Sequence, residues 1–156
     1  MNSLTLRIVT LCTFALLLTG WAKAAQAQFT LLSVSGSPAP FTITTAVAGS
    51  QPAALTNSVT TYFIKAKHPG GAQRIAAQLD APMPLGTTLT VQMVASPGAT
   101  SLGAVSLDAT VRDIVINIDK ENGSTYGITY VFTATVTAGV IPTQTRTVTF
   151  TESAYP

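Results

Sequence analysis

The chain has 156 residues, of which 47% are hydrophobic and only 9% are charged. Its formal net charge of +2 is too small to attract nucleic acid or an anionic lipid surface. Cys12 is the single cysteine, which excludes an intrachain disulfide and a cysteine-based metal site.

The N-terminal residues have the three parts of a secretory signal peptide. Arg7 supplies the positive start, residues 8–18 form an almost unbroken apolar run, and small residues lead to Ala25-Gln26-Ala27. The apolar run is too short for a spanning helix, so we expect cleavage before Gln28 and no stable membrane span afterwards. We therefore predict a signal peptide at residues 1–27 and secretion to the periplasm, the cell surface or the extracellular space.

Residues 28–156 are predicted to form a single β-sandwich domain. They contain as many basic as acidic side chains, so no nucleic-acid partner is expected. They are rich in Thr, Val and Ile and poor in Lys and Glu, which favours strands over helices.

The expected strands alternate with turns that are rich in proline and glycine. In chain order they are residues 29–34, 41–47, 58–66, 73–79, 87–94, 101–107, 111–118, 128–137 and 143–151. This spacing predicts an all-β, antiparallel, immunoglobulin-like β-sandwich of about eight or nine strands, with a closed β-barrel as the alternative.

Two hairpins are predicted near the end of the chain. Residues 119–124 form a polar stretch with Asn122-Gly123, a pair typical of tight turns, between two expected strands. Residues 138–142 join the strands at 128–137 and 143–151, and the simplest reading of that connection is again a hairpin.

The chain offers few groups for catalysis. His68, the only histidine, precedes Pro-Gly-Gly and is expected to be an exposed turn residue; a hydrolase would need a nucleophile and a carboxylate beside it. Asp108 with Asp113, and Asp119 with Glu121, are the nearest carboxylate pairs, but they occupy positions typical of solvated loop charges. We therefore expect no catalytic residues and a protein that is not an enzyme.

A metal site is not expected either. Asp119, Glu121 and Asn122 place three oxygen donors before Gly123, but an EF-hand loop needs a glycine at its sixth position and a glutamate at its twelfth. The same residues fit a hairpin turn. We predict neither a metal nor another cofactor.

The end of the chain carries a more specific pattern. The strand Thr147-Val148-Thr149-Phe150-Thr151-Glu152 alternates strictly, and Tyr155 is the next-to-last residue. Over the last ~30 residues the chain resembles bacterial exported β-sandwich proteins of the fimbrial-subunit and spore-coat-U type. In chaperone–usher subunits such a strand and tyrosine pair with a chaperone and a neighbouring subunit, so the resemblance implies that Val148, Phe150 and Tyr155 pair with a partner.

The same resemblance implies a role for the first strand. Residues 29–34, with Phe29 and Leu31 among their apolar side chains, would be a donor strand for a partner.

Sparse charge also favours association, because a sheet with few charged edge residues is weakly protected against edge-to-edge pairing. The leading interpretation is an exported, non-enzymatic structural or surface-assembly protein that acts through strand contacts with itself or with another exported subunit. The alternative is a periplasmic or extracellular binding module that holds a sugar, a peptide or calcium in the loops at 68–71, 82–86 and 119–124.

Overall fold

The computed structural model describes residues 29–44, 50–67 and 71–156. The predicted signal peptide at 1–27 lies outside these residues. The described chain forms nine strands and one short 3-10 helix, η1 (Val136–Ala138). The strands are β1 (Phe29–Ser35), β2 (Leu55–Lys67), β3 (Gln73–Leu79), β4 (Thr87–Met93), β5 (Thr100–Ser101), β6 (Val105–Leu107), β7 (Arg112–Ile118), β8 (Lys120–Ala134) and β9 (Val148–Ala154).

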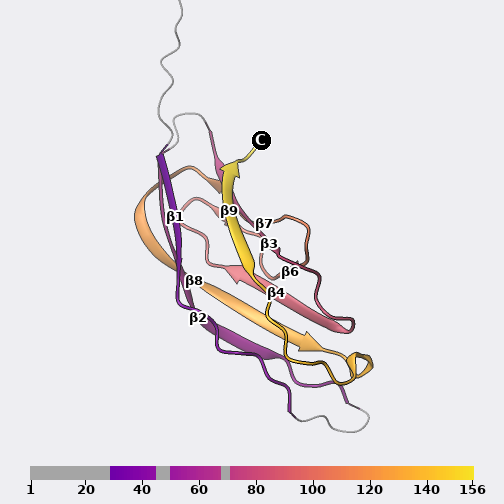
Figure 1. Ribbon diagram of the computed structural model, residues 1–156. Coiled ribbons are helices and arrows are strands. Elements are labelled where there is room, and N and C mark those ends of the chain that lie inside the picture. The colour runs from indigo at the N-terminus through magenta and orange to yellow at the C-terminus, as the bar shows by residue number, and fades with distance from the viewer. Residues whose placement is uncertain (1–28, 45–49, 68–70) are drawn as a thin grey trace, which may run out of the picture.

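The strands form two antiparallel sheets (Figure 1). One sheet has five strands in the order β1-β2-β8-β4-β6, and the other has four in the order β5-β7-β3-β9. The sheets are separate, which confirms the predicted all-β sandwich and rules out a closed barrel for the described chain.

The core lies between the two sheets and follows from the alternation of side chains along each strand. In β2, Tyr62, Ile64 and Ala66 are buried while Lys65 and Lys67 are exposed. Successive strand residues point to opposite faces, so one apolar set covers the core and the polar set faces water. Apolar residues of β3, β4, β7 and β8 complete the cluster from both sheets.

The predicted turn at residues 119–124 is wrong. β7 and β8 belong to different sheets, and the chain crosses between them at Asp119. Gly123 lies inside β8 with φ of 107°, where the cross-strand partner shifts between Ile64 and Lys65. A glycine with positive φ suits a β-bulge as well as a turn, because it has no Cβ to clash.

The predicted hairpin across residues 138–142 is also wrong. β8 ends at Ala134 in the five-stranded sheet, whereas β9 pairs with β3 in the other sheet. The connection passes through η1 and a long segment without regular structure, so the chain switches sheets again.

Four further strand predictions need correction. The strand expected at 128–137 is β8, which begins at Lys120 and ends at Ala134, and the strand expected at 143–151 is β9, which begins at Val148 and ends at Ala154. Phe41–Thr44 form no strand, and residues 45–47 of that prediction lie outside the described chain. The single strand expected at 101–107 is two short pieces, β5 and β6, which pair with different sheets.

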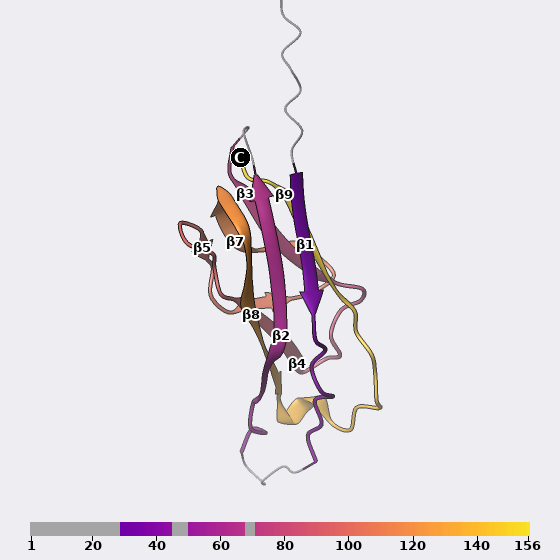
Figure 2. The same ribbon diagram turned by 90° about the vertical axis from the view of Figure 1, so that its left-hand side faces the viewer.

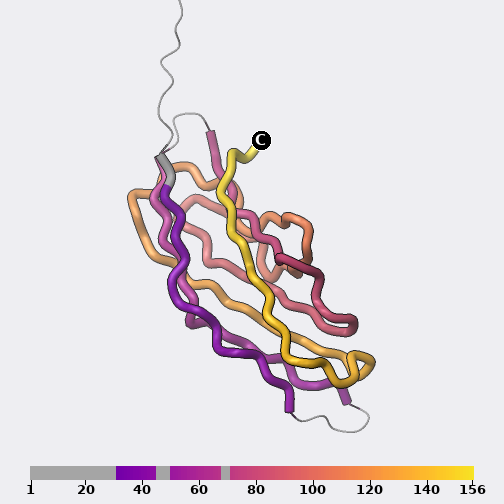
Figure 3. Tube along the Cα trace, viewed as in Figure 1, coloured from indigo at the N-terminus to yellow at the C-terminus, as the bar shows by residue number. Residues whose placement is uncertain are grey.

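The two long sides of the sandwich differ. On one side the edge strands β5 and β6 are short, and the backbone N–H of Leu79 donates to the carbonyl of Asp108 at 2.8 Å where the sheets meet. On the other side the edges are β1 and β9, seven residues each. Figures 2 and 3 show both strands along the same side of the molecule, with β5 and β7 on the opposite side in Figure 2. Short edge strands limit pairing with other chains, and this second side lacks that protection.

Candidate functional site: a groove between β1 and β9

The inward face of β1 is incompletely covered. Leu32 is paired in register with Ile64, and Val34 with Tyr62. Both partners are buried on the core side of β2, and paired residues share a face, so Leu32 and Val34 also face inward. Val34 nevertheless remains 43% exposed. An inward-facing valine with this exposed fraction indicates that the four-stranded sheet does not cover this part of β1.

β9 presents the facing wall. Val148 is paired with Leu79 and Phe150 with Ala77, and both partners are buried. The two β9 side chains therefore face the core, and each is only partly buried. The threonines that alternate with them are exposed on the outer face: Thr147, Thr149 and Thr151.

Between these walls lies a groove of about 1430 Å³. Its walls and floor include Leu32, Val34, Val148, Phe150, Tyr130 and Phe132. The lining residues of β9 fall between Val148 and Glu152, so this part of the groove is about 17 Å long at ~3.4 Å per residue. Among the described residues, no strand pairing or backbone hydrogen bond joins β1 to β9. We call this space the seam groove.

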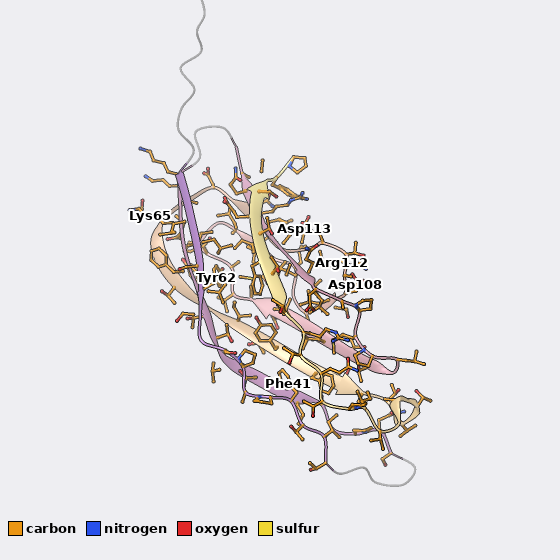
Figure 4. All side chains as sticks on the ribbon, in the orientation of Figure 1. Phe41, Tyr62, Lys65, Asp108, Arg112 and Asp113 are labelled. Atoms are coloured by element: carbon orange, nitrogen blue, oxygen red, sulfur yellow. The ribbon has the colours of Figure 1, made fainter. Side chains whose placement is uncertain are left out.

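Phe41 helps to line the lower part of the seam groove. Its ring stacks on Phe132 of β8, with centroids 5.8 Å apart and an interplanar angle of 29°. Figure 4 shows Phe41 toward the end of the molecule that lies away from the C-terminus. The segment after β1 thus packs on the floor there by aromatic contact, which adds to its hydrophobic burial.

Charge is scarce in the seam groove. Of the residues that line it, Arg146 and Glu152 are the charged ones. Arg146 and Glu152 alternate along the chain with Val148 and Phe150. Glu152 is paired with the buried Ile75, so Glu152 faces the same side as Val148 and Phe150. The groove is therefore apolar along its middle, with one basic and one acidic side chain on its β9 wall.

Two buried tyrosines lie beside and beneath this region. Tyr62 donates its hydroxyl hydrogen to the carbonyl of Val94, and its ring lies 5.6 Å from that of Tyr126. Burial raises the pKa of the Tyr62 phenol, and the charges of Tyr126 and Glu121 raise it further. Burial likewise raises the pKa of Tyr130 to about 12.

An alkaline titration tests this burial. Exposed tyrosines of the unfolded chain ionise near 10.0, so the unfolded state releases protons before Tyr130 does. The stability contributed by Tyr130 is present below pH 10 and is lost as the pH rises toward about 12. Tyrosinate absorbance should show delayed ionisation that coincides with unfolding, and Tyr130→Phe should reduce the delayed amplitude. Ionisation of all phenols near the ordinary value, with an unchanged circular dichroism spectrum, would contradict it.

Of the residues predicted to pair with a partner, two line the seam groove and the others do not. Val148 and Phe150 face the seam groove. Leu31 is paired with the exposed Lys65 on the outer face of β2, and Phe29 is paired in register with Lys67. β1 as a whole is the edge strand of this chain's own sheet, over its full length. Tyr155 follows β9, and its N–H donates to the carbonyl of Ala72 at 2.9 Å.

Sequence reasoning missed Leu32 and Val34. The signal was present, because their positions alternate with Leu31, but the adjacent leucines concealed which face is buried. The face shared by Arg146, Val148 and Phe150 was visible in the alternation of the last strand. The opposite wall, β1, could not be identified from the sequence, because the order of the strands in the fold determines which strand lies across the groove.

The other candidate groups lie elsewhere. His68 falls outside the described residues. Asp108 pairs with Arg112 at 2.7 Å and Asp113 with Arg74 at 3.2 Å, on the side of the molecule away from β1 (Figure 4). Hydrogen bonds from the Arg112 side chain and from the backbone N–H of Thr110 hold the pKa of Asp108 below its ordinary value.

The predicted oxygen donors near residue 120 point in different directions. Asp119 is exposed, whereas Glu121 is buried and accepts hydrogen bonds from Ser124 Oγ at 2.8 Å and Tyr126 OH at 3.0 Å. Within the described ranges, no three His, Cys, Asp or Glu side chains gather as a metal site would require. The same ranges hold no helix long and apolar enough to cross a membrane.

Comparison with known proteins adds one structural likeness. No family model matches the chain, and no curated protein matches its sequence. The fold is similar to the crystal structure of the CupB6 tip adhesin from Pseudomonas aeruginosa, with a TM-score of 0.48 and 12% identity. The match covers 79% of this chain but 42% of the adhesin, so this chain spans less than half of that protein. A likeness at this level carries no functional argument.

Proposed function

We propose that this chain is a subunit of an exported assembly and that its seam groove accepts an extended strand of another polypeptide. The strand would carry apolar side chains at every second position. The observation that carries the proposal is Val34, an inward-facing residue of an ordered edge strand that is 43% exposed beside an apolar groove.

The backbone geometry supports a strand as the occupant. Among the described residues β1 pairs only with β2 and β9 only with β3, so each leaves one edge of N–H and C=O groups without a neighbouring strand. β1 runs away from the C-terminal end of the molecule while β9 runs toward it (Figure 1). An inserted strand can bond to such an edge through its main chain while its alternate side chains fill the apolar layer.

The size of the seam groove supports the same occupant. A volume of about 1430 Å³ exceeds the roughly 300–1,000 Å³ typical of small-ligand pockets. On the β9 side its lining extends along the chain from Ile141 to Glu152 rather than around one point. A segment of polypeptide fits this form better than one sugar or ion does.

Peptide binding tests the proposal. The probe is a fluorescently labelled, nine-residue peptide with valine at alternate positions and threonine or lysine between them. Val34→Asp should weaken its binding by at least about tenfold, because filling the groove would bury a carboxylate that has no partner. Leu31→Asp, on the outer face of the same strand, is the matched control and should bind like the unaltered chain.

Fluorescence anisotropy gives the affinities, and circular dichroism verifies that both variants are folded. Sedimentation velocity over a hundredfold range of concentration asks whether a second copy supplies the strand: oligomers that Val34→Asp removes would identify it, and monomers would indicate a different partner. Absence of both peptide binding and oligomers would refute the proposal, as would equal loss of binding in the two variants.

A further inference from the structure

We propose that Arg146 recognises a carboxylate on the inserted strand, so that the seam groove selects its partner by charge as well as by apolar contact. The carboxylate would belong to an acidic side chain or to the C-terminus of the strand. This assignment depends on the strand-accepting role proposed above.

Arg146 is held in place at one end of the β9 wall. Its Nε donates to the carbonyl of Pro82 at 3.1 Å, its Nη1 to the carbonyl of Thr145 at 3.0 Å, and its Nη2 to Oε1 of Gln144 at 2.6 Å. These bonds fix the guanidinium plane and use three of its five N–H groups. One N–H on each Nη remains for a further acceptor such as a carboxylate.

The acceptors around Arg146 are all neutral, which distinguishes it from the other arginines of the described chain. Arg74 pairs with Asp113, and Arg112 pairs with Asp108. No carboxylate of the described residues lies within ion-pair distance of Arg146. Arg146 is a partly buried residue that lines the groove, so a carboxylate on an incoming strand would supply the charged partner that the described chain does not.

Glu152 makes the groove electrically asymmetric. It lies on the same face six residues further along, about 20 Å away at ~3.3 Å per residue. At that separation, which exceeds the Debye length of roughly 8 Å at physiological salt, the two charges act on an incoming strand separately. A carboxylate is attracted near Arg146, so the acidic end of the strand is expected there.

Four versions of the alternating peptide test this assignment. One is neutral and amidated at its C-terminus, one has a terminal glutamate facing the groove, one has lysine there, and one has a free C-terminal carboxylate. Against the unaltered chain, at least one carboxylate peptide should bind about tenfold more tightly than the neutral one at low salt, and added salt should reduce this ratio. The better of the two identifies the source of the carboxylate.

Arg146→Gln should abolish this preference and leave the affinity for the neutral peptide unchanged. Arg146→Glu should reverse the preference toward the lysine peptide. Lys67→Gln, which removes an equal charge from the exposed face of β2, is the matched control and should keep the preference. The two proposals fail differently: no binding of any peptide overturns the strand-accepting groove, whereas equal binding of neutral and carboxylate peptides overturns only the role of Arg146.

Discussion

Replacing Ile64 with alanine is expected to lower the free energy of unfolding by about 2–5 kcal/mol. Ile64 is fully buried in β2, opposite Leu32 of β1 and Ser124 of β8. Its loss removes apolar contacts between the layers and leaves a cavity that the surrounding strands fill only partly. Urea denaturation followed by circular dichroism measures the change.

Leu85→Ala is the control for the same loss of apolar side chain. Leu85 is 89% exposed in the turn before β4, so its truncation should change the free energy of unfolding by no more than about 0.5 kcal/mol. Similar destabilisation in the two variants would mean that the core does not lie where the strand alternation places it.

Strand positions could be predicted from sequence because alternation is a local property. The face occupied by Tyr62, Ile64 and Ala66 repeats at every second residue, and solvation of the intervening lysines selects the outer face. The same reasoning located β3, β4 and β7 without knowledge of their neighbours, and it found the last strand but began it five residues too early.

Connections could not be predicted in this way. Alternation identifies a strand but not the sheet it joins, so β7–β8 and β8–β9 both resembled hairpins and both cross between sheets. The first crossing takes a single residue, Asp119, and the bulge at Gly123 then shifts the register of β8 on β2.

The seam groove was beyond sequence reasoning for a related reason. Val148 and Phe150 were identified as one apolar face, but the opposite wall is formed by Leu32 and Val34, more than a hundred residues earlier. Long-range strand order brings these walls together, and no local pattern records it. The groove is the space between β1 and β9, two edge strands of the described chain that belong to different sheets.

If the seam groove accepts a strand, supplying that strand in the same chain should stabilise the protein strongly. A fusion that continues from Pro156 through a short Gly-Ser linker into an alternating valine strand can reach the groove, because Tyr155 directly follows the β9 wall. A short flexible linker gives an effective concentration of the order of 1 mM. For a peptide with a dissociation constant of about 1 μM, this corresponds to about 4 kcal/mol of added stability.

The expected increase in the melting temperature is then roughly 15 °C for a domain of this size. A fusion of equal length with serine in place of the valines is the control, since it provides the same linker without apolar side chains and should melt near the unfused chain. Val34→Asp in the valine fusion should remove most of the gain, because its carboxylate would be buried by the strand. A similar increase from both tails would show that the added chain acts without entering the groove, and no increase from either would show that the gap between β1 and β9 does not take a strand.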